Sequence, residues 1–135
     1  MNIWVNGCFD ILHGGHLDLL EYAKNLDNLE NYLVVGIDSD ERVKLLKGSG
    51  RPINHESFRK RILESLEFVD EVVIFGSEKE LETIIKRHDI DYIIVGDHYK
   101  NKRVVGAEYA KFGVEFFKTD DRSTTAIINK LKNNI

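Results

Sequence analysis

The segment His13-Gly14-Gly15-His16 constrains this chain more than any other part of its sequence. It follows Ile3-Trp4-Val5, which reads as a first strand, and it precedes apolar residues at helical spacing. A strand, a glycine-containing turn and a helix start gather free backbone N–H groups, which bind anions. Two histidines three residues apart lie on one helix face and add side-chain donors. The pattern therefore predicts a site for phosphate groups, such as those of a nucleotide.

The histidine pair is also compatible with two different roles when the residues alone are considered. The imidazoles of His13 and His16 would fit a purely structural role, with hydrogen bonds near the helix start. They would also fit a zinc site, but Cys8 is the only cysteine and convincing third and fourth ligands are missing from the sequence. We therefore favour phosphate binding over both.

Apolar runs of strand length alternate with helical patterns along the whole chain. This alternation predicts an α/β fold that is Rossmann-like and doubly wound, with a mostly parallel five-stranded sheet and helices on both faces. Ligands of such sheets bind beyond the carboxyl ends of the strands. The expected strands are 2–6, 32–37, 71–75, 92–95 and 114–117. The expected helices are 15–26, a short one from Ser39 to about Leu46, one carrying Phe58, Ile62 and Leu66, one after Ser77, one near 104–111, and one from about Ser123.

The length of 135 residues predicts a single domain, 1–135, with one core. One cysteine excludes an internal disulfide and fits a reducing compartment, so we expect a cytoplasmic protein. The N-terminus lacks a signal-peptide pattern, and no apolar run approaches the roughly 20 residues of a membrane helix. The net charge of −4 argues against general nucleic-acid binding. We therefore expect neither a membrane nor a nucleic-acid partner.

One segment has the opposite charge balance. From Arg42 to Arg61 the chain carries seven basic side chains and a single acidic one, Glu56. Such a run usually forms a solvated helix face. In an acidic chain it also suits a small polyanion such as a triphosphate. An RNA-binding role is a weaker alternative, since the segment lacks an aromatic platform for bases.

The residues around the histidines resemble a known superfamily. Gly7, Phe9, Asp10, His13, Gly15 and His16 match the pattern G-x-F-D-x-x-H-x-G-H of the H-x-G-H nucleotidyltransferases. The resemblance implies that His13, His16 and Lys47 are catalytic, with Lys47 on the triphosphate. It implies nucleotide binding by the turn Gly7-Cys8-Phe9-Asp10 and by Gly15. It also implies nucleotide binding by Arg59, which lies on the expected helix that carries Phe58.

The resemblance extends to the C-terminal half of the chain. Ser123-Thr124-Thr125 matches an S-[ST]-T helix start, where hydroxyls and N–H groups would hold phosphate; helix capping is the alternative role. Gly96 and Asp97 lie where the superfamily forms part of its nucleotide pocket. The following loop, with His98, Lys100, Lys102 and Arg103, would cover the acceptor phosphate, unless it is simply a solvated loop.

Within the superfamily, the chain looks most like the heptose 1-phosphate nucleotidyltransferases. The matching segments are 46–54, 96–99, 105–108 and 122–128. The glycerol 3-phosphate cytidylyltransferases are the next nearest group, but their typical tryptophan-containing loop is replaced here by Gly96-Asp97-His98-Tyr99. The resemblance therefore implies ATP with a heptose 1-phosphate-like acceptor, rather than CTP with glycerol 3-phosphate.

The implied reaction joins a nucleoside monophosphate to a sugar phosphate and releases pyrophosphate. Such catalysis depends mainly on positioning and charge neutralisation. Mg²⁺ is the expected cofactor of a triphosphate substrate, and Asp10 is the nearest carboxylate, with support of the turn as its equally good alternative role. A nucleotide sensor without turnover remains a second hypothesis. Superfamily members of this size often pair, so we expect a homodimer.

Overall fold

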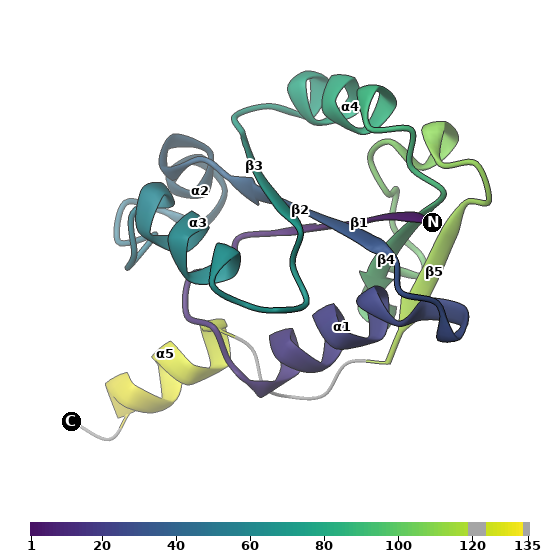
Figure 1. Cartoon of the computed structure of the whole chain (residues 1–135). Helices are drawn as coiled ribbons and strands as arrows, with labels where there is room; N and C mark the ends of the chain where they lie inside the picture. Colours follow the sequence, from purple (N-terminus) through teal and green to yellow (C-terminus); the bar gives the residue numbers. More distant parts are fainter. Residues whose placement is uncertain (119–123, 134–135) are drawn as a thin grey trace.

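The computed structural model describes residues 1–118 and 124–133. Its centre is a five-stranded, all-parallel sheet with the strand order β3-β2-β1-β4-β5 (Figure 1). The strands are β1 (Asn2–Gly7), β2 (Tyr32–Asp38), β3 (Glu71–Phe75), β4 (Tyr92–Gly96) and β5 (Val114–Phe117). The predicted α/β class and parallel sheet are confirmed.

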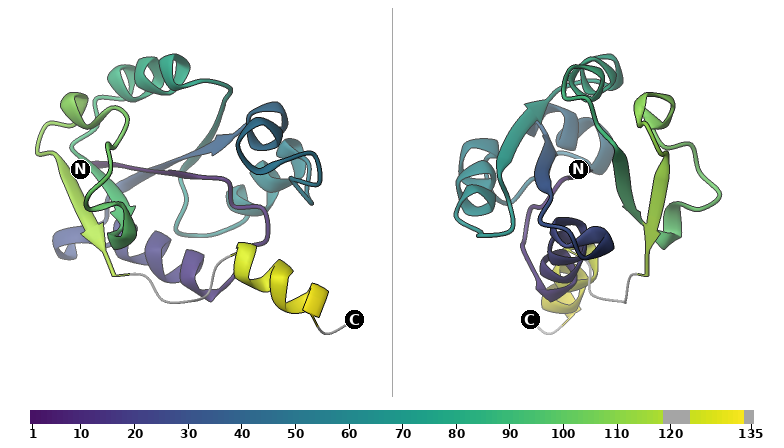
Figure 2. Two further views of the ribbon diagram at one scale, coloured as in Figure 1. Left: turned by 180° about the vertical axis from the view of Figure 1, so that it is seen from behind. Right: turned by 45° about the vertical axis from the view of Figure 1, so that its right-hand side comes forward.

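Helices cover both faces of the sheet (Figures 1 and 2). One face carries α4 (Glu78–Arg87), and the opposite face carries α1 (Gly14–Lys24), with α5 (Thr124–Asn133) on the same side as α1. The helices α2 (Asp40–Lys47) and α3 (Glu56–Glu64) follow each other between β2 and β3. Short 3₁₀ turns, η1 (Leu26–Asn28), η2 (Asp97–Tyr99) and η3 (Ala107–Tyr109), complete the described elements.

The inner strands are apolar on both sides because each side has its own core. Ile3 and Val5 of β1 pack on the α1 side with Leu20 of α1 and Leu63 of α3. Trp4 packs on the α4 side, in a cluster that contains Leu81 and Ile85 of α4. Continuous apolar runs, rather than alternating ones, are the pattern of strands buried on both faces.

Three predicted helices differ in extent from the structure. The helix expected to carry Phe58, Ile62 and Leu66 ends at Glu64, before Leu66. The helix expected near 104–111 is only the 3₁₀ turn η3, because Gly106 adopts a φ of +85° and breaks the helical path. A Cβ on Gly106 would lie 2.6 Å from Ile85 Cδ1, so the chain passes against α4 there. The helix expected over 15–26 ends at Lys24, and Asp27 in the following turn has a φ of +59°.

The inner face of α3 carries an arginine and not the phenylalanine that marked this helix in the sequence. Phe58 is 50% exposed, while Arg59 and Leu63 are buried. A sequence pattern based on hydrophobicity assigns the inner face to the phenylalanine, but here the arginine takes it. The guanidinium of Arg59 lies inside because it finds backbone carbonyl oxygens of β2 and of the turn after β1 there.

The sheet is open between β1 and β4, beyond the first residues of the two strands. The pairing of β1 with β4 covers only Ile3 with Tyr92 and Trp4 with Ile93, although both strands continue to their final glycines. In contrast, β1 stays paired with β2 up to Gly7 and Ile37. This is the point where the strand order reverses, and ligands of open α/β sheets bind at such a switch point. The carboxyl ends of β1 and β4 therefore form a fork that can admit a ligand.

Close packing supports the sheet next to this fork. A Cβ at Gly36 of β2 would lie 2.4 Å from Cζ2 of Trp4, so the indole occupies the space of the missing side chain. The Trp4 side chain is fully buried, and its Nε1 donates a hydrogen bond to Asn6 Oδ1 at 2.9 Å.

Candidate functional site

A cavity of about 800 Å³ lies beyond the carboxyl ends of the strands. The last residue of every strand lines it: Gly7, Asp38, Phe75, Gly96 and Phe117. Several residues predicted for the site line it as well: Gly7, Cys8, Phe9, His13, Gly15, His16, Lys47, Gly96 and Arg103. The fold thus places the first histidine motif, the end of α2 and the loop after β4 around one space.

The two histidines of the motif form the start of α1. His13 is the N-cap residue, and its Nδ1 accepts a hydrogen bond from the Gly15 backbone N–H at 3.1 Å. In return, Nδ1 of His16 accepts a hydrogen bond from the His13 backbone N–H at 3.3 Å. This is a capping box made of imidazoles, with the rings stacked at 3.8 Å between centroids. The arrangement fixes both rings at the cavity wall.

These hydrogen bonds determine which nitrogen of each ring carries the proton. Because Nδ1 accepts in both rings, neither ring is an imidazolium here, and the proton of each neutral imidazole sits on Nε2. Burial lowers the pKa of His16 to about 4, and the neighbouring His13 and Lys47 lower it further. At neutral pH His16 is therefore a neutral donor through Nε2–H.

Cationic side chains dominate the charge of the cavity wall. Arg42, Lys47, Arg103 and Lys118 line it, against the carboxylates of Asp18 and Asp38. The chain as a whole has a net charge of −4, so this excess of positive charge is local. Lys47 is close enough to lower the pKa values of Cys8 and His16, although burial is the larger effect on the Cys8 thiol and raises its pKa. The cavity is suited to an anionic ligand.

Asp10 supports the motif from behind. Its carboxylate is buried and accepts hydrogen bonds from the backbone N–H groups of Ile53 and Asn54, both at 2.8 Å, and from Arg51 Nε at 3.1 Å. The Asp10 carbonyl accepts a fourth from Asn54 Nδ2. These contacts favour the structural alternative for Asp10: it ties the loop before α3 to the histidine turn.

Arg59 has a different role from the expected contact with nucleotide. Its side chain is fully buried, and its guanidinium donates to the carbonyl oxygens of Asn54, Cys8 and Asp38 and to the Asp40 carboxylate, at 2.8–3.0 Å. Burial alone would raise the pKa of Asp40, but hydrogen bonds from Arg59 and the Glu56 N–H, with the Arg59 charge, hold it below its usual value. Arg59 therefore joins β1, β2 and α3 behind the cavity.

The chain was compared with models of known protein families, and one of them matches. The family model described as cytidylyltransferase-like matches residues 4–130, which includes the histidine turn, the fork and the cavity wall. The chain belongs to the cytidylyltransferase-like family. This assignment confirms the superfamily resemblance of the sequence motifs, and the matched range covers β1 from Trp4 onward, the other four described strands and the start of α5.

Similar proteins of this family carry the name "Bifunctional protein HldE". The chain is 45% identical to the one from Campylobacter fetus subsp. fetus over 130 residues, and 44% identical to those from Nitratiruptor sp. and Helicobacter pylori strain J99. Each match covers 96% of this chain but only 27–28% of the relative. The chain thus spans a little over a quarter of the length of these relatives.

Solved structures share the fold of this cytidylyltransferase-like chain. A lipopolysaccharide core biosynthesis protein from Thermoplasma volcanium has a TM-score of 0.69 at 24% identity, with 90% of this chain and 98% of that chain covered. A protein of unknown function from Archaeoglobus fulgidus has a TM-score of 0.67 at 18% identity, with 92% and 94% covered. At these identities the similarity supports the Rossmann-like fold alone.

The loop after β4 is only partly at the cavity. Arg103 lines it but also bonds to Glu78 and Glu82 of α4, at 3.3 and 3.1 Å, while Lys100 and Lys102 are exposed and outside the lining. Asp97 begins η2 and is likewise outside the lining. The side chains of His98, Thr124 and Thr125, and the whole of Ser123, lie outside the described residues.

The sequence reasoning missed several cavity residues. Asp38 ends β2, and Arg42, four residues later, bonds to it through Nε at 2.9 Å. Tyr99 and Phe75 also line the cavity. The sequence could have indicated Asp38 and Arg42, because Asp38 stands at the end of a predicted strand and the cation follows one helical turn later. Nothing in the sequence indicated that Phe75, at the far end of the sheet, would reach the same cavity.

The structure weakens the RNA-binding alternative. Of the seven basic residues between Arg42 and Arg61, three are engaged by aspartates inside the domain: Arg42 by Asp38, Arg51 by Asp10 and Arg59 by Asp40. The basic segment is therefore used partly to hold the domain together rather than as an open cationic face. Within the described residues, no helix has both the length and the apolar character to cross a membrane.

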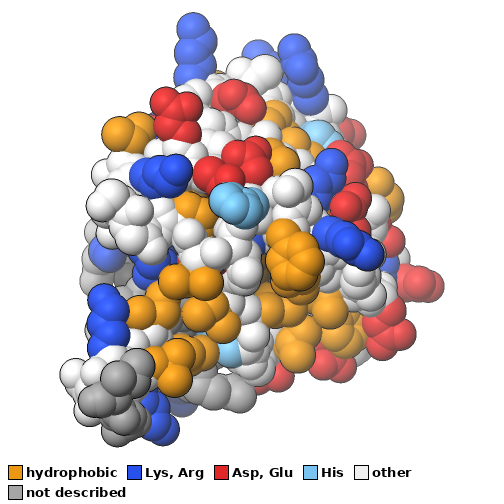
Figure 3. Space-filling view, turned by 90° about the vertical axis from the view of Figure 1, so that its left-hand side faces the viewer, with side chains coloured by type: hydrophobic (Ala, Val, Ile, Leu, Met, Phe, Trp, Pro, Cys, Tyr) orange, Lys and Arg blue, Asp and Glu red, His pale blue; other side chains and the backbone are white. Residues whose placement is uncertain are grey.

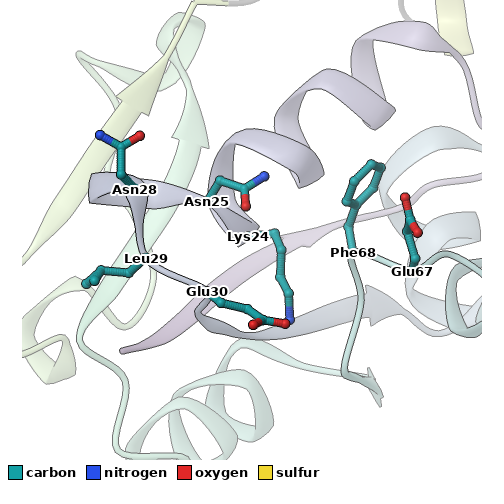
Figure 4. Close-up of a pocket in the computed structure, with 7 residues that line it drawn as sticks. All are labelled: Lys24, Asn25, Asn28, Leu29, Glu30, Glu67 and Phe68. Carbon is teal, nitrogen blue, oxygen red and sulfur yellow. The ribbon is translucent and has the colours of Figure 1, made fainter.

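A second pocket, of about 560 Å³, lies elsewhere on the cytidylyltransferase-like domain (Figure 4). It is lined by Lys24, Asn25, Asn28, Leu29, Glu30, Glu67 and Phe68. These residues come from the C-terminal end of α1 and the segments before β2 and β3, away from the histidines. Its lysine is already paired with Asp70 at 2.7 Å. The motif residues therefore single out the larger cavity as the functional site.

The lowered pKa of His16 predicts an acid-sensitive contribution to stability. Below pH 6.5 the unfolded chain binds a proton at His16 that the folded chain refuses until about pH 4. The free energy of unfolding should therefore fall as the pH drops through this window. We expect His16→Asn to reduce the loss of stability between pH 7 and pH 4.5 by about 1–2 kcal/mol, measured by urea denaturation. An equal loss in both proteins would contradict the assigned pKa.

Proposed function

We propose that this chain is a nucleotidyltransferase that transfers adenylate from ATP to a heptose 1-phosphate-like acceptor and releases pyrophosphate. The observation that carries the proposal is the capping box of His13 and His16, which presents two neutral imidazoles at the wall of a cationic cavity. Membership of the cytidylyltransferase-like family and the similarity to the HldE proteins support it. The motif match to heptose 1-phosphate nucleotidyltransferases supports the choice of acceptor.

The reaction follows from the charges of its groups. An oxygen of the acceptor phosphate attacks the α-phosphorus of ATP, and the bond from that phosphorus to the bridging oxygen of the leaving pyrophosphate breaks. The attacking oxygen is already anionic, so no side chain has to remove a proton. His13 and His16 donate from Nε2 to phosphate oxygens, and Lys47 neutralises charge on the triphosphate. Ser123, Thr124 and Thr125 are proposed to bind the triphosphate as well, as the motif resemblance implies.

A magnesium ion is proposed to accompany the triphosphate, but the described residues do not provide a site for it on their own. They contain no group of three or more His, Cys, Asp or Glu side chains placed to hold a metal ion. The nearest carboxylate, Asp10, already accepts three hydrogen bonds. The described residues therefore do not form a resident metal centre, and a magnesium ion would arrive together with the triphosphate.

The substrate proposal is tested by crossing nucleotides with acceptors. We expect faster pyrophosphate release with ATP and heptose 1-phosphate than with CTP and glycerol 3-phosphate. A site built to bond several hydroxyl groups rejects a smaller acceptor, because its own polar groups would stay unpaired. The reverse preference would assign the chain to the glycerol 3-phosphate group. Nucleotide binding without pyrophosphate release from any pair would favour the sensor hypothesis.

The proposal includes a homodimer and a cytoplasmic location. Figure 3 shows hydrophobic side chains gathered on the side of the molecule where α2, α3 and α5 lie in Figure 1. Exposed apolar residues of this region are Leu45, Leu46, Ile53, Phe58 and Leu131. Contiguous exposed apolar surface is typical of protein interfaces. We expect sedimentation at micromolar concentration to show a dimer, and Leu45→Glu to shift it to monomer. A wild-type chain that sediments only as a monomer would remove this part of the proposal.

A further inference from the structure

Arg42 is a cavity residue with no task in the proposed reaction. It lies in the first turn of α2, where its backbone N–H donates to Ser39 Oγ at 3.2 Å. Its side-chain Nε donates to Asp38 Oδ1 at 2.9 Å, and its guanidinium carbon lies 5.7 Å from the centre of the Phe75 ring. Only 19% of the side chain is exposed. The guanidinium is therefore held in position before any ligand arrives.

The held guanidinium still has donors to offer. Within residues 1–118 and 124–133, Asp38 is the only group hydrogen-bonded to the side chain of Arg42, and it uses Nε. The four N–H groups on the two Nη atoms remain, on the planar edge that matches two phosphate oxygens. Because the side chain is already ordered, binding costs little further conformational entropy. Arg42 is thus a preformed donor for an anion in the cavity.

The position of Arg42 in the cavity indicates which anion it binds. The histidines lie at the start of α1, where Phe9 and Leu19 belong to the core on the α1 side. Phe75, under the Arg42 guanidinium, belongs with Leu81 to the core on the α4 side. These two parts of the lining therefore continue into two different core clusters. If the nucleotide phosphates occupy the histidine side, the α4 side is left for the second substrate.

We propose that Arg42 binds the phosphate group of the acceptor and thereby determines which acceptors are used. This inference rests on the proposed function, which supplies a second, phosphate-bearing substrate. Asp38 and Phe75 act as positioning residues, since they orient the guanidinium without touching the substrate. The exposed lysines of the loop after β4, which the sequence suggested for this role, are outside the cavity lining.

Steady-state kinetics of Arg42→Gln and Arg42→Lys test the inference. We expect Arg42→Gln to raise the KM for heptose 1-phosphate by roughly 10- to 100-fold, the value of a charge-assisted hydrogen bond, with the KM for ATP changed by less than about 2-fold. Arg42→Lys should recover only part of the loss, because an ammonium has no planar pair of donors. Lys44→Gln, which removes an exposed cation from the same helix, is the matched control. A purely structural role would alter both KM values together or neither, and either result would overturn the inference.

A binding measurement separates this inference from the reaction itself. Calorimetry of heptose 1-phosphate is performed with the α,β-methylene analogue of ATP present, so that no turnover is needed. Binding that is lost in Arg42→Gln and kept in Lys44→Gln supports the role of Arg42, even if the wild type releases no pyrophosphate with ATP. Unchanged binding in Arg42→Gln overturns it, even if the wild type is an active transferase. No binding to the wild type overturns both proposals.

Discussion

Replacing His13 or His16 with asparagine is expected to lower the turnover number by about 10²- to 10³-fold, the cost of removing one donor aimed at transition-state charge. The structure explains why asparagine is the informative substitution. Its side-chain oxygen can accept the backbone N–H that Nδ1 accepts now, so the start of α1 keeps its cap. The shorter side chain does not reach the position of Nε2, so only the phosphate donor is lost.

The controls for this experiment come from the same chain. His55→Asn removes a histidine whose side chain is 88% exposed and outside the cavity lining, and its turnover should match the wild type. His13→Ala removes both the cap and the donor, and we expect it to lose stability as well as rate. Turnover is followed as pyrophosphate release, and folding by circular dichroism. A folded His16→Asn variant with a near-normal rate would show that the imidazole does not act on the substrate.

Arg59→Met is expected to destabilise the domain by about 3–5 kcal/mol, the usual cost of removing one partner from a buried ion pair. The substitution leaves the carboxylate of Asp40 and the carbonyl oxygens of Cys8, Asp38 and Asn54 without their common donor. Arg59→Lys should recover little, because one ammonium cannot reach partners on three separate segments. Urea denaturation at pH 7 measures the difference in the free energy of unfolding.

Arg61→Met is the matched control for Arg59. Arg61 is an exposed arginine two residues along the same helix, so its loss should change stability by less than about 0.5 kcal/mol. A small effect of Arg59→Met, comparable to that of Arg61→Met, would mean that the buried guanidinium is replaceable by apolar volume. A normal free energy of unfolding with reduced affinity for ATP would instead restore the nucleotide contact that the sequence suggested.

Local patterns predicted the sheet and the turn that carries the histidines. The strand patterns predicted β3 and β5 with the bounds that the structure has, and the motif placed His13 and His16 at the start of α1. Both features depend on neighbours in the sequence, which periodicity and turn chemistry describe well. The predicted catalytic histidines and Lys47 accordingly lie at one cavity.

The roles of Asp10, Arg42 and Arg59 required the folded structure. Asp10 finds its partners 41–44 residues away, and Arg59 reaches Cys8 across 51 residues. A pattern of residue types shows that an arginine is present, but not whether its guanidinium faces a ligand or a set of carbonyl oxygens. The same reasoning accounts for Phe58, which is exposed because the neighbouring arginine takes the inner face of α3.

The fork between β1 and β4 separates what keeps this domain folded from what selects its substrates. Below the fork, Trp4 fills the space over Gly36 and pairs with Ile93, and these residues tolerate little change. Above the fork, the cavity exists because β1 and β4 are no longer paired, and this does not depend on which side chains border it. Cavity side chains outside the core can be exchanged there with little loss of stability, so an engineer could redesign acceptor choice on this scaffold at Arg42 or Arg103 while leaving the sheet untouched.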